Sequence, residues 1–291
     1  ELPYSVLTSE QLRKEFGQAT FFTATDGNHG RGVAWAANRL GQKAVVHMPK
    51  GTTLTRLQNI AKEGAQVDIQ ELNYDDCVRL AAKEADETPR GVIVQDTAWD
   101  GYEEIPAWIM QGYGTMAMEA GEQLKAQGCE RPTHIFVQAG VGSLAGAVVG
   151  YFSNLYADNL PTFVVVEAEA AACLYKGAAA GDGEIRIVDG DMQTIMAGLA
   201  CGEPNTISWD ILKNHVKVFI AAPVKGDAPI TSGESGAAPF GALAAMMTMD
   251  EYKDLRNDIG LDENSKVLLF STEGDTDPDR YKNIVWKGLD K

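Results

Sequence analysis

Short runs of apolar residues recur along the chain, and longer segments with helical periodicity separate them. The runs are rich in Val, Ile, Phe and Thr, and several are apolar throughout, as is typical of strands covered on both faces. They are Thr20–Thr25, Lys43–Met48, Gln66–Glu71, Gly91–Gln95, Thr133–Gln138, Thr162–Glu167, Val216–Ile220 and Lys266–Ser271. Helices are expected over His29–Leu40, Leu54–Glu63, Asp75–Glu87, Ile105–Gln127, Ser143–Leu155 and Phe240–Asp258. This alternation predicts an α/β fold with doubly wound parallel sheets.

The length of the chain, 291 residues, suggests two domains at roughly 150 residues per domain. The expected seam lies in the segment Ile105–Gln127, after four closely spaced strand–helix units and before a glycine-rich centre. We therefore expect a smaller α/β domain over residues 1–112 and a larger one over residues 113–291. The first residues, Glu1-Leu2-Pro3, include no initiating Met, so a processed, truncated or partly observed chain is expected.

Composition narrows the possible functions. The formal net charge of −16 would repel phosphate backbones and argues against a nucleic-acid partner. No apolar run approaches the roughly 20 residues that a membrane span needs. The four cysteines have neither metal-site nor disulfide spacing, which fits a reducing cytoplasm, and no metal is expected.

A glycine-rich loop follows the fifth expected strand and leads into a helix. It contains Gly140, Val141, Gly142, Ser143 and Leu144. Its glycines allow the backbone to approach a ligand, and the helix start offers free N–H groups to an anion. A phosphate monoester fits this loop better than a nucleotide, because there is no Walker-type lysine. The alternative is an ordinary strand-to-helix turn.

A second polar loop, Asp26-Gly27-Asn28-His29-Gly30, follows the first expected strand. Asp or Asn at a helix start often caps the helix, and that is one interpretation of this loop. Capping needs only one such residue, however, and here Asp, Asn and His lie between two glycines. The cluster therefore favours a ligand-binding loop at the carboxyl end of a strand. His29 taken alone is more typical of a capping or packing histidine than of a catalytic one.

The loop Thr25–Gly30 resembles the Ser-x-Gly-Asn-His-Gly loop of the fold-type II pyridoxal-phosphate enzymes, the tryptophan synthase β and threonine dehydratase group. Asp26 lies at the x position, where these enzymes usually have serine. The segments QAGVGSLAG, IMAGLACGEPN, ITSGESGA and FSTEGDTD extend the resemblance over nearly the whole chain, to the diaminopropionate ammonia-lyase family. The resemblance implies two α/β domains, pyridoxal 5'-phosphate as cofactor, a small amino-acid substrate and a homodimer.

The resemblance also implies roles for individual residues. Asn28 would bind the ring hydroxyl of the cofactor, the loop Gly140–Leu144 its phosphate, and Ser271 or Thr272 its ring nitrogen. Asp26 would serve as a second base, Asp96 would hold the second ammonium of the substrate, and Glu234 would face the cofactor. Each has a simpler alternative: Asp96 as a turn residue, the two hydroxyls as an ordinary strand end, and Glu234 as a helix cap.

Two departures accompany the resemblance. The lysine that carries the cofactor in the family lies well upstream of the Asp-Gly-Asn-His loop, and Lys14 does not match its segment. We therefore expect that lysine to lie upstream of residue 1. The chain segment from Ala222 to Lys225 is also shorter than the corresponding segment in the family, which has a further helical stretch there.

The expected activity is α,β-elimination of D- and L-diaminopropionate to pyruvate and ammonia. Asp26 serves the D isomer in this hypothesis, because it would stand on the cofactor face opposite the lysine. Two alternatives stay open: another β-eliminating amino-acid dehydratase of the same fold, and a non-catalytic binding or regulatory module that lacks the lysine. Cys173 and Cys201 flank a segment that the resemblance places near the substrate, either as free thiols or as a regulatory disulfide.

Overall fold

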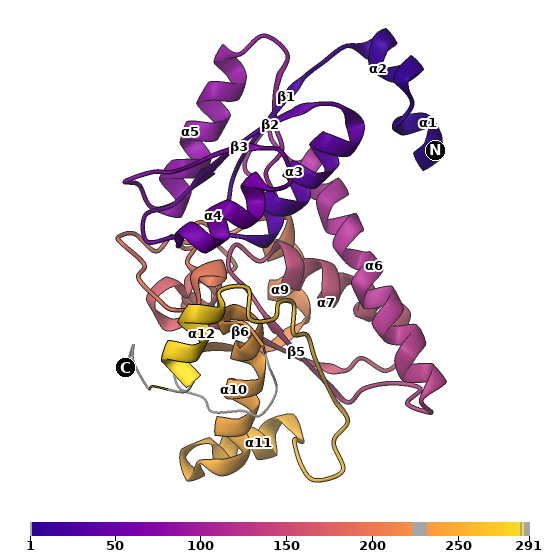
Figure 1. Cartoon of the computed structure of the whole chain (residues 1–291). Helices are drawn as coiled ribbons and strands as arrows, with labels where there is room; N and C mark the ends of the chain where they lie inside the picture. The colour runs from indigo at the N-terminus through magenta and orange to yellow at the C-terminus, as the bar shows by residue number, and fades with distance from the viewer. Residues whose placement is uncertain (1, 223–231, 286, 288–291) are drawn as a thin grey trace. The chain divides into compact units, whose positions relative to one another are not determined.

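The computed structural model describes residues 2–222, 232–285 and 287, and the chain divides into two compact units (Figure 1). Unit 1 is Glu1–Gln95 and unit 2 is Asp96–Lys291. The division lies earlier than the boundary expected after residue 112, because the helix that spans that position runs unbroken within unit 2 and packs along another helix of that unit.

Unit 1 is built around one parallel sheet. Its elements are α1 (Tyr4–Leu7), α2 (Glu10–Phe16), β1 (Thr20–Ala24), α3 (Asn28–Leu40), β2 (Lys43–Met48), α4 (Leu54–Ala61), β3 (Gln66–Ile69), α5 (Tyr74–Glu87) and β4 (Gly91–Ile93). The strand order is β3-β2-β1-β4, and every neighbouring pair is parallel. The four strands expected here therefore form, with ends shifted by up to two residues.

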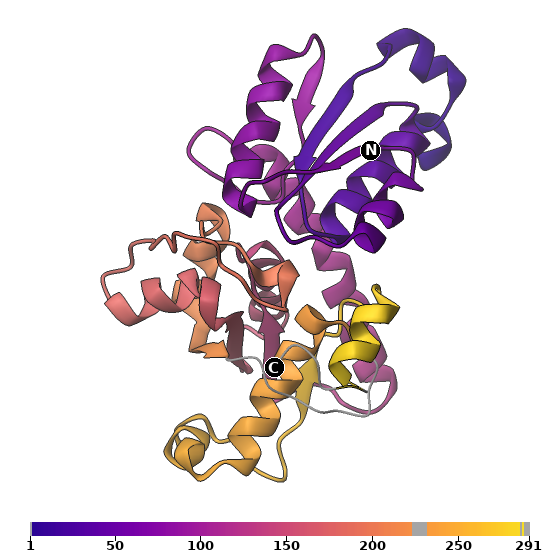
Figure 2. The same cartoon turned by 60° about the vertical axis from the view of Figure 1, so that its left-hand side comes forward.

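The alternation of side chains along β2 explains why helices cover both faces of this sheet. Val46 and Met48 are buried with Ala34 of α3 and Ile60 of α4. Val45 packs instead against a cluster that includes Ala81 and Ala85 of α5. Successive strand residues face opposite sides, so each side needs an apolar cover. Figures 1 and 2 show α3 and α4 on one side of the strands and α5 on the other.

Unit 2 repeats the same architecture. Its elements are α6 (Glu104–Ala126), β5 (His134–Gln138), α7 (Ser143–Leu155), β6 (Thr162–Ala168), α8 (Cys173–Ala180), α9 (Thr206–His215), β7 (Val216–Ala222), α10 (Glu234–Thr248), α11 (Lys253–Ile259), β8 (Val267–Leu269) and α12 (Pro278–Val285). The strand order β7-β6-β5-β8 is parallel throughout. Its two faces also alternate: Ile135 and Val137 pack with α7 and α9, and Phe136 packs with α10.

The prediction of a single helix over Phe240–Asp258 is wrong. The structure has α10 and α11 instead, because Met249 takes an extended conformation at the end of α10. The earlier start at Glu234 depends on a distant residue: the Oε1 atom of Glu273 accepts the N–H of Ser235 at 3.3 Å and satisfies the first turn. Such tertiary capping has no local sequence signal.

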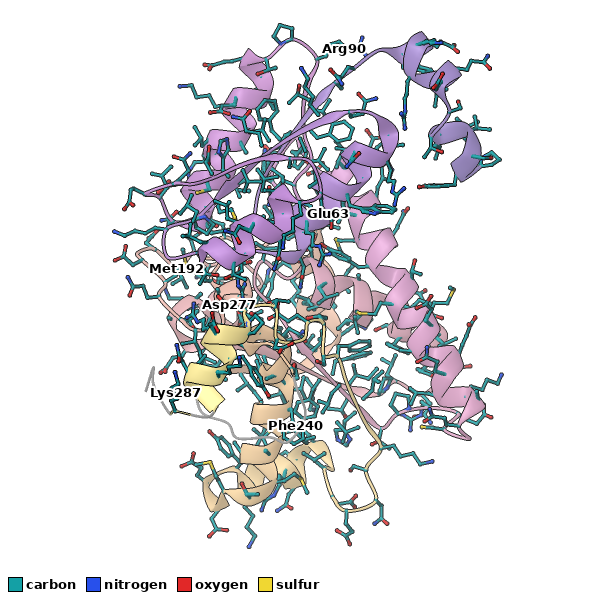
Figure 3. All side chains as sticks on the ribbon, viewed as in Figure 1. Glu63, Arg90, Met192, Phe240, Asp277 and Lys287 are labelled. Carbon is teal, nitrogen blue, oxygen red and sulfur yellow. The ribbon has the colours of Figure 1, made fainter. Side chains whose placement is uncertain are left out.

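Five helices were not expected from the sequence: α1, α2, α8, α9 and α12. They are short, and side chains cap the starts of α2, α9 and α12. Asp277, labelled in Figure 3, accepts the N–H of Arg280 at 3.2 Å and caps α12. The shortened step between Ala222 and Lys225 lies outside the described residues. No helix in the described part of the chain is long and apolar enough to cross a membrane.

Each sheet has one point at which the strand order reverses. In unit 1 the reversal is at β1, which lies between β2 and β4, and in unit 2 it is at β5, between β6 and β8. Open parallel sheets bind ligands beyond the carboxyl ends of the strands at such points. The topology thus singles out the loops after β1 and β4 in unit 1, and those after β5 and β8 in unit 2.

Candidate functional site

The loop after β1 in unit 1 brings α3 very close to the end of the strand. A Cβ atom on Gly30 would lie 2.1 Å from Cγ2 of Thr25, so only glycine fits there. Gly27 occupies the N-cap of α3, which means that neither Asp26 nor Asn28 stands in the capping position. The side chain of Asn28 is exposed to solvent at the first helical residue. The polar side chains of this loop therefore do not cap α3, and Asn28 among them is exposed.

His29 has a structural role in this loop. Its Nε2 atom lies 2.9 Å from the carbonyl oxygen of Val94 and 3.0 Å from the hydroxyl of Thr23. These contacts hold the start of α3 against the residues that follow β4. The packing role expected for this histidine agrees with its position.

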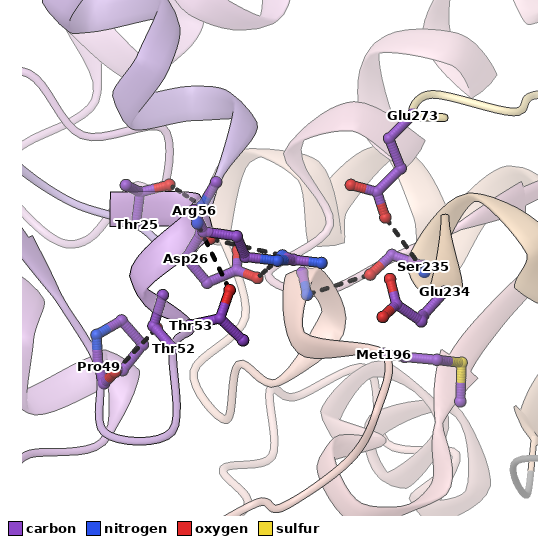
Figure 4. A network of polar contacts seen from close by, with 12 residues as sticks. Thr25, Asp26, Pro49, Thr52, Thr53, Arg56, Met196, Glu234, Ser235 and Glu273 are labelled. Atoms are coloured by element: carbon purple, nitrogen blue, oxygen red, sulfur yellow. Dashed lines mark hydrogen bonds and ion pairs between the residues drawn. The ribbon is translucent and has the colours of Figure 1, made fainter. Parts of the chain in front are cut away.

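Asp26 forms a partly buried ion pair that was not expected from the sequence. Its Oδ2 atom accepts a hydrogen bond from Nη1 of Arg56 at 2.8 Å, and the same nitrogen lies 3.4 Å from the Asp26 carbonyl oxygen (Figure 4). The two side chains are only 16% and 5% exposed. The contact is a charge-assisted hydrogen bond, which restricts the orientation of the Asp26 carboxylate.

Asp96, the first residue of unit 2, is held through both its side chain and its backbone. Its Oδ2 atom accepts a hydrogen bond from the hydroxyl of Tyr113 at 3.1 Å. Burial raises the pKa of Tyr113 well above its usual value of 10, and the neighbouring Asp96 carboxylate raises it further. The phenol thus stays protonated and donates, which fixes the orientation of the Asp96 carboxylate.

The glycine-rich loop after β5 has the features of an anion-binding cradle. Gly142, the N-cap of α7, has φ of +101°, and a Cβ there would lie 2.8 Å from the Ser208 hydroxyl oxygen. No side chain caps α7, and its first turn contains no acidic residue. The N–H groups and the positive dipole end of a 13-residue helix are therefore left for an anion.

Ser143 contributes to this cradle with its backbone and not with its hydroxyl. The hydroxyl donates to the carbonyl oxygen of Asp96 and accepts from Nδ2 of Asn205 at 2.8 Å. The expected phosphate contact of Ser143 is thus restricted to its N–H group.

Asn205, which the sequence analysis missed, joins these two loops. Its Nδ2 atom also donates to the Asp96 carbonyl at 3.0 Å, and its N–H donates to the Val141 carbonyl at 2.8 Å. Its Oδ1 atom accepts the N–H of Ser208 at 3.0 Å and caps α9. The side chain is fully buried, so one residue ties together the Asp96 loop, the glycine-rich loop and α9.

The two hydroxyls after β8 have different partners. Thr272 accepts a hydrogen bond from Nε2 of Gln138, the last residue of β5, at 2.8 Å. Ser271 lies 2.8 Å from the hydroxyl of Ser232. A hydroxyl that accepts from an amide keeps its own proton for a further acceptor, so Thr272 can donate to a ligand.

Glu234 starts α10 and forms an ion pair instead of capping its helix. Its Oε1 atom lies 3.4 Å from Nε of Arg280 in α12, with the Glu234 side chain 13% exposed. Glu273 caps α10 in its place through Oε1, which accepts the N–H of Ser235, and its carbonyl oxygen accepts the N–H of Gly233 at 2.9 Å. Glu273 was not expected at this site from the sequence.

A second buried carboxyl group, Glu167, lies at the end of β6. Its two oxygens accept the N–H groups of Leu174 at 2.9 Å and Tyr175 at 2.7 Å, at the start of α8. Burial raises the pKa of Glu167 to about 8 from its usual 4.5, although the two N–H donors act in the opposite direction. Nearby, the Sγ of Cys173 lies 3.7 Å from the carbonyl oxygen of Cys201, and the two cysteines form no disulfide.

Glu167 makes the stability of the fold depend on pH. From about pH 4.5 to about pH 8 the unfolded chain has lost this proton while the folded chain keeps it, so the free energy of unfolding falls as pH rises. We expect Glu167→Gln to flatten this slope, measured by urea unfolding at several pH values across that range. The exposed neighbour Glu169, changed to Gln, is the matched control and should leave the slope intact. An unchanged slope in Glu167→Gln would contradict the raised pKa.

Comparisons with known proteins place this geometry in a family. Residues 4–225 match the family described as pyridoxal-phosphate dependent enzyme. Diaminopropionate ammonia-lyase of Salmonella typhimurium is 52% identical in an alignment of 302 positions that covers 99% of this chain and 74% of that protein.

Two solved structures from Escherichia coli are similar to nearly the whole chain. The structure of diaminopropionate ammonia lyase in complex with D-serine matches with a TM-score of 0.86 at 42% identity, covering 99% of this chain and 74% of that one. The structure of the same enzyme in complex with an aminoacrylate-PLP azomethine reaction intermediate matches with a TM-score of 0.85 at 41% identity, covering 98% and 80%.

Proposed function

The chain belongs to the pyridoxal-phosphate dependent enzymes and, within them, to the diaminopropionate ammonia-lyase family, and we propose on this premise that it converts 2,3-diaminopropionate of either configuration to pyruvate and ammonia. The observation that carries the proposal is the 52% identity to a diaminopropionate ammonia-lyase along 99% of this chain. The complex of the Escherichia coli relative with D-serine supports a binding site that accepts a D-amino acid.

The residues of unit 2 fit the phosphate and the ring nitrogen of pyridoxal phosphate. The uncapped start of α7 and the glycine-rich loop supply N–H groups of Gly140, Gly142, Ser143 and Leu144 for the phosphate oxygens. Thr272 is the better candidate for the ring nitrogen, since its proton remains available to an acceptor. When bound, the cofactor supplies an electron-accepting ring that stabilises negative charge on the α-carbon of the substrate.

In unit 1, Asn28 and Asp26 have separate tasks in this proposal. The exposed amide of Asn28 would bind the ring hydroxyl of the cofactor. The Asp26 carboxylate would take the α-proton of the D isomer, because a base must reach that proton within hydrogen-bond distance and the L isomer carries it on the other face. A different base then serves the L isomer.

Asp96 would select a substrate with a second amino group. Its carboxylate, oriented by the Tyr113 hydroxyl, is suited to a charge-assisted hydrogen bond from the β-ammonium group of diaminopropionate. Serine and threonine offer a neutral hydroxyl at that position. We therefore expect a higher kcat/KM for diaminopropionate than for D-serine, which would distinguish this activity from that of a serine dehydratase.

The experiment that tests the proposed function uses the protein that contains this chain. Purified protein should be yellow, and borohydride should remove the colour and leave a cofactor-labelled lysine peptide. Both isomers of diaminopropionate should give pyruvate, detected with lactate dehydrogenase. A protein that binds the cofactor and forms no pyruvate would instead be a non-catalytic module. A colourless protein that pyridoxal phosphate cannot titrate would refute the cofactor assignment.

The different partners of Thr272 and Ser271 give a direct comparison. Thr272→Val should lower kcat by about 10-fold on both isomers, because the ring nitrogen loses a hydrogen-bond partner worth about 1–3 kcal/mol. The Gln138 amide also loses its acceptor, which should lower the stability of the fold. It should also change the absorbance spectrum of the bound cofactor. Ser271→Ala, the matched control on the same segment, should do neither. If the two variants exchange these effects, Ser271 is the ring-nitrogen partner.

We further propose a cytoplasmic homodimer. The family resemblance supports the dimer, and the four cysteines, three of them buried and none in a disulfide, support a reducing compartment. Light scattering of the purified protein should give twice the mass of its chain.

A further inference from the structure

The Asp26–Arg56 pair differs from the other arginine–aspartate pairs that the structure describes. Its side chains are 16% and 5% exposed, whereas Asp76 and Arg79 in α5 are 44% and 58% exposed. Removing two charges from water is costly, and surface pairs contribute little. A pair so largely shielded from water, in a loop after β1 that the topology marks for ligand binding, therefore indicates a role beyond surface electrostatics.

Arg56 belongs to a rigid element, and Asp26 does not. Arg56 lies in the first turn of α4, where the hydroxyl of Thr53 accepts its N–H at 3.4 Å. One turn later, Ile60 is buried in the core between α3, α4 and β2. Asp26 instead lies in the loop between β1 and α3. The position of the guanidinium is therefore set by the helix, and the guanidinium in turn fixes the carboxylate.

We propose that Arg56 is a positioning residue that determines the activity of the enzyme toward D-diaminopropionate. This inference rests on the proposed function, in which the Asp26 carboxylate accepts the α-proton of the D isomer. Arg56 itself exchanges no proton. It holds one oxygen of the carboxylate at 2.8 Å, which restricts the directions from which the group can reach the substrate. The L reaction does not use Asp26 as its base, so it does not depend on Arg56 in this way.

The test compares kcat/KM on the two isomers in the same preparation of holoenzyme. Arg56→Met should lower kcat/KM on the D isomer by about 10- to 100-fold, the effect of misplacing a reacting group by about 1 Å. The L reaction should change by no more than a few fold, and it also reports that the variant is folded and holds cofactor. Arg56→Lys keeps the charge and should recover part of the D activity. Arg79→Met, in an exposed pair of the same unit, is the control and should change neither reaction.

Two further measurements show whether Arg56 acts through Asp26. In an Asp26→Asn background, Arg56→Met should cost the D reaction little more, because the carboxylate it positions is already gone. With D substrate deuterated at the α-carbon, the isotope effect on kcat/KM should rise in Arg56→Met, since proton removal becomes more rate-limiting. The isotope effect for the L isomer should stay unchanged.

The outcomes separate this inference from the function on which it rests. Equal losses on both isomers in Arg56→Met and Arg56→Lys, or fully additive losses in the double variant, would overturn the role of Arg56. If Asp26→Asn itself fails to separate the isomers, the assignment of Asp26 as the D-specific base fails. If Asp26→Asn separates them and Arg56→Met does not, only the positioning role is refuted.

Discussion

Replacing Asp26 with Asn is expected to lower kcat/KM on D-diaminopropionate by at least about 100-fold, the lower end of the effect of removing a general base. The amide has nearly the same shape as the carboxylate and can still accept a hydrogen bond from Arg56, but it does not accept the α-proton. The L reaction should fall much less, because its α-proton lies on the opposite face of the substrate. Steady-state kinetics on both isomers, with cofactor content measured for each preparation, provide the comparison.

The control for this variant is a change that disturbs the loop without removing a base. Thr25 precedes Asp26, and its methyl group lies against Gly30, so Thr25→Ser opens a small space beside the loop while it keeps the hydroxyl that accepts the Gly27 N–H at 3.0 Å. It should affect both isomers equally. Equal losses in Asp26→Asn would mean that Asp26 only positions the substrate or the cofactor, and the mechanism with two bases would be abandoned.

The sheets were predictable from the sequence because their signal is local. All eight expected strands form, since buried parallel strands must be apolar over several consecutive residues. Both candidate loops were identified for a related reason: each combines glycines with polar residues where an apolar run ends. The strand order β3-β2-β1-β4, repeated as β7-β6-β5-β8, then places these loops at the two points of reversal.

The residues that hold the site together were not predictable in the same way. From the sequence alone, Arg56 is expected to be a solvated helix residue. Nothing near it in the sequence indicates that its partner is Asp26, which lies on another segment. Gln138 ends an expected strand, but its contact with Thr272 depends on β5 and β8 being neighbours. Asn205 alone had a local signal, since Asn before Thr-Ile-Ser is typical of a helix cap. That signal predicts the cap and not the bonds to the two ligand loops.

A single substitution at Asn205 is expected to reduce both the free energy of unfolding and the affinity for the cofactor. Asn205→Asp keeps the volume of the side chain and the oxygen that caps α9, but replaces the two N–H donors with an oxygen that faces the Asp96 carbonyl. The free energy of unfolding should fall by about 2–3 kcal/mol, as expected when buried hydrogen-bonding groups lose their partners. The dissociation constant of pyridoxal phosphate should rise by at least about 10-fold, because the Asp96 loop and the glycine-rich loop are no longer joined.

Asn154 provides the matched control, because it is an exposed asparagine in α7 of the same unit that donates only to the Gly150 carbonyl. Asn154→Asp introduces the same chemical change and should alter neither quantity appreciably. Urea unfolding of the cofactor-free protein measures stability, and fluorescence titration with pyridoxal phosphate measures affinity. A loss of stability with unchanged affinity would show that Asn205 supports only the fold of unit 2. Loss of both, with the cap of α9 preserved, would show that the Asp96 loop must be tied to the phosphate cradle for the cofactor to bind.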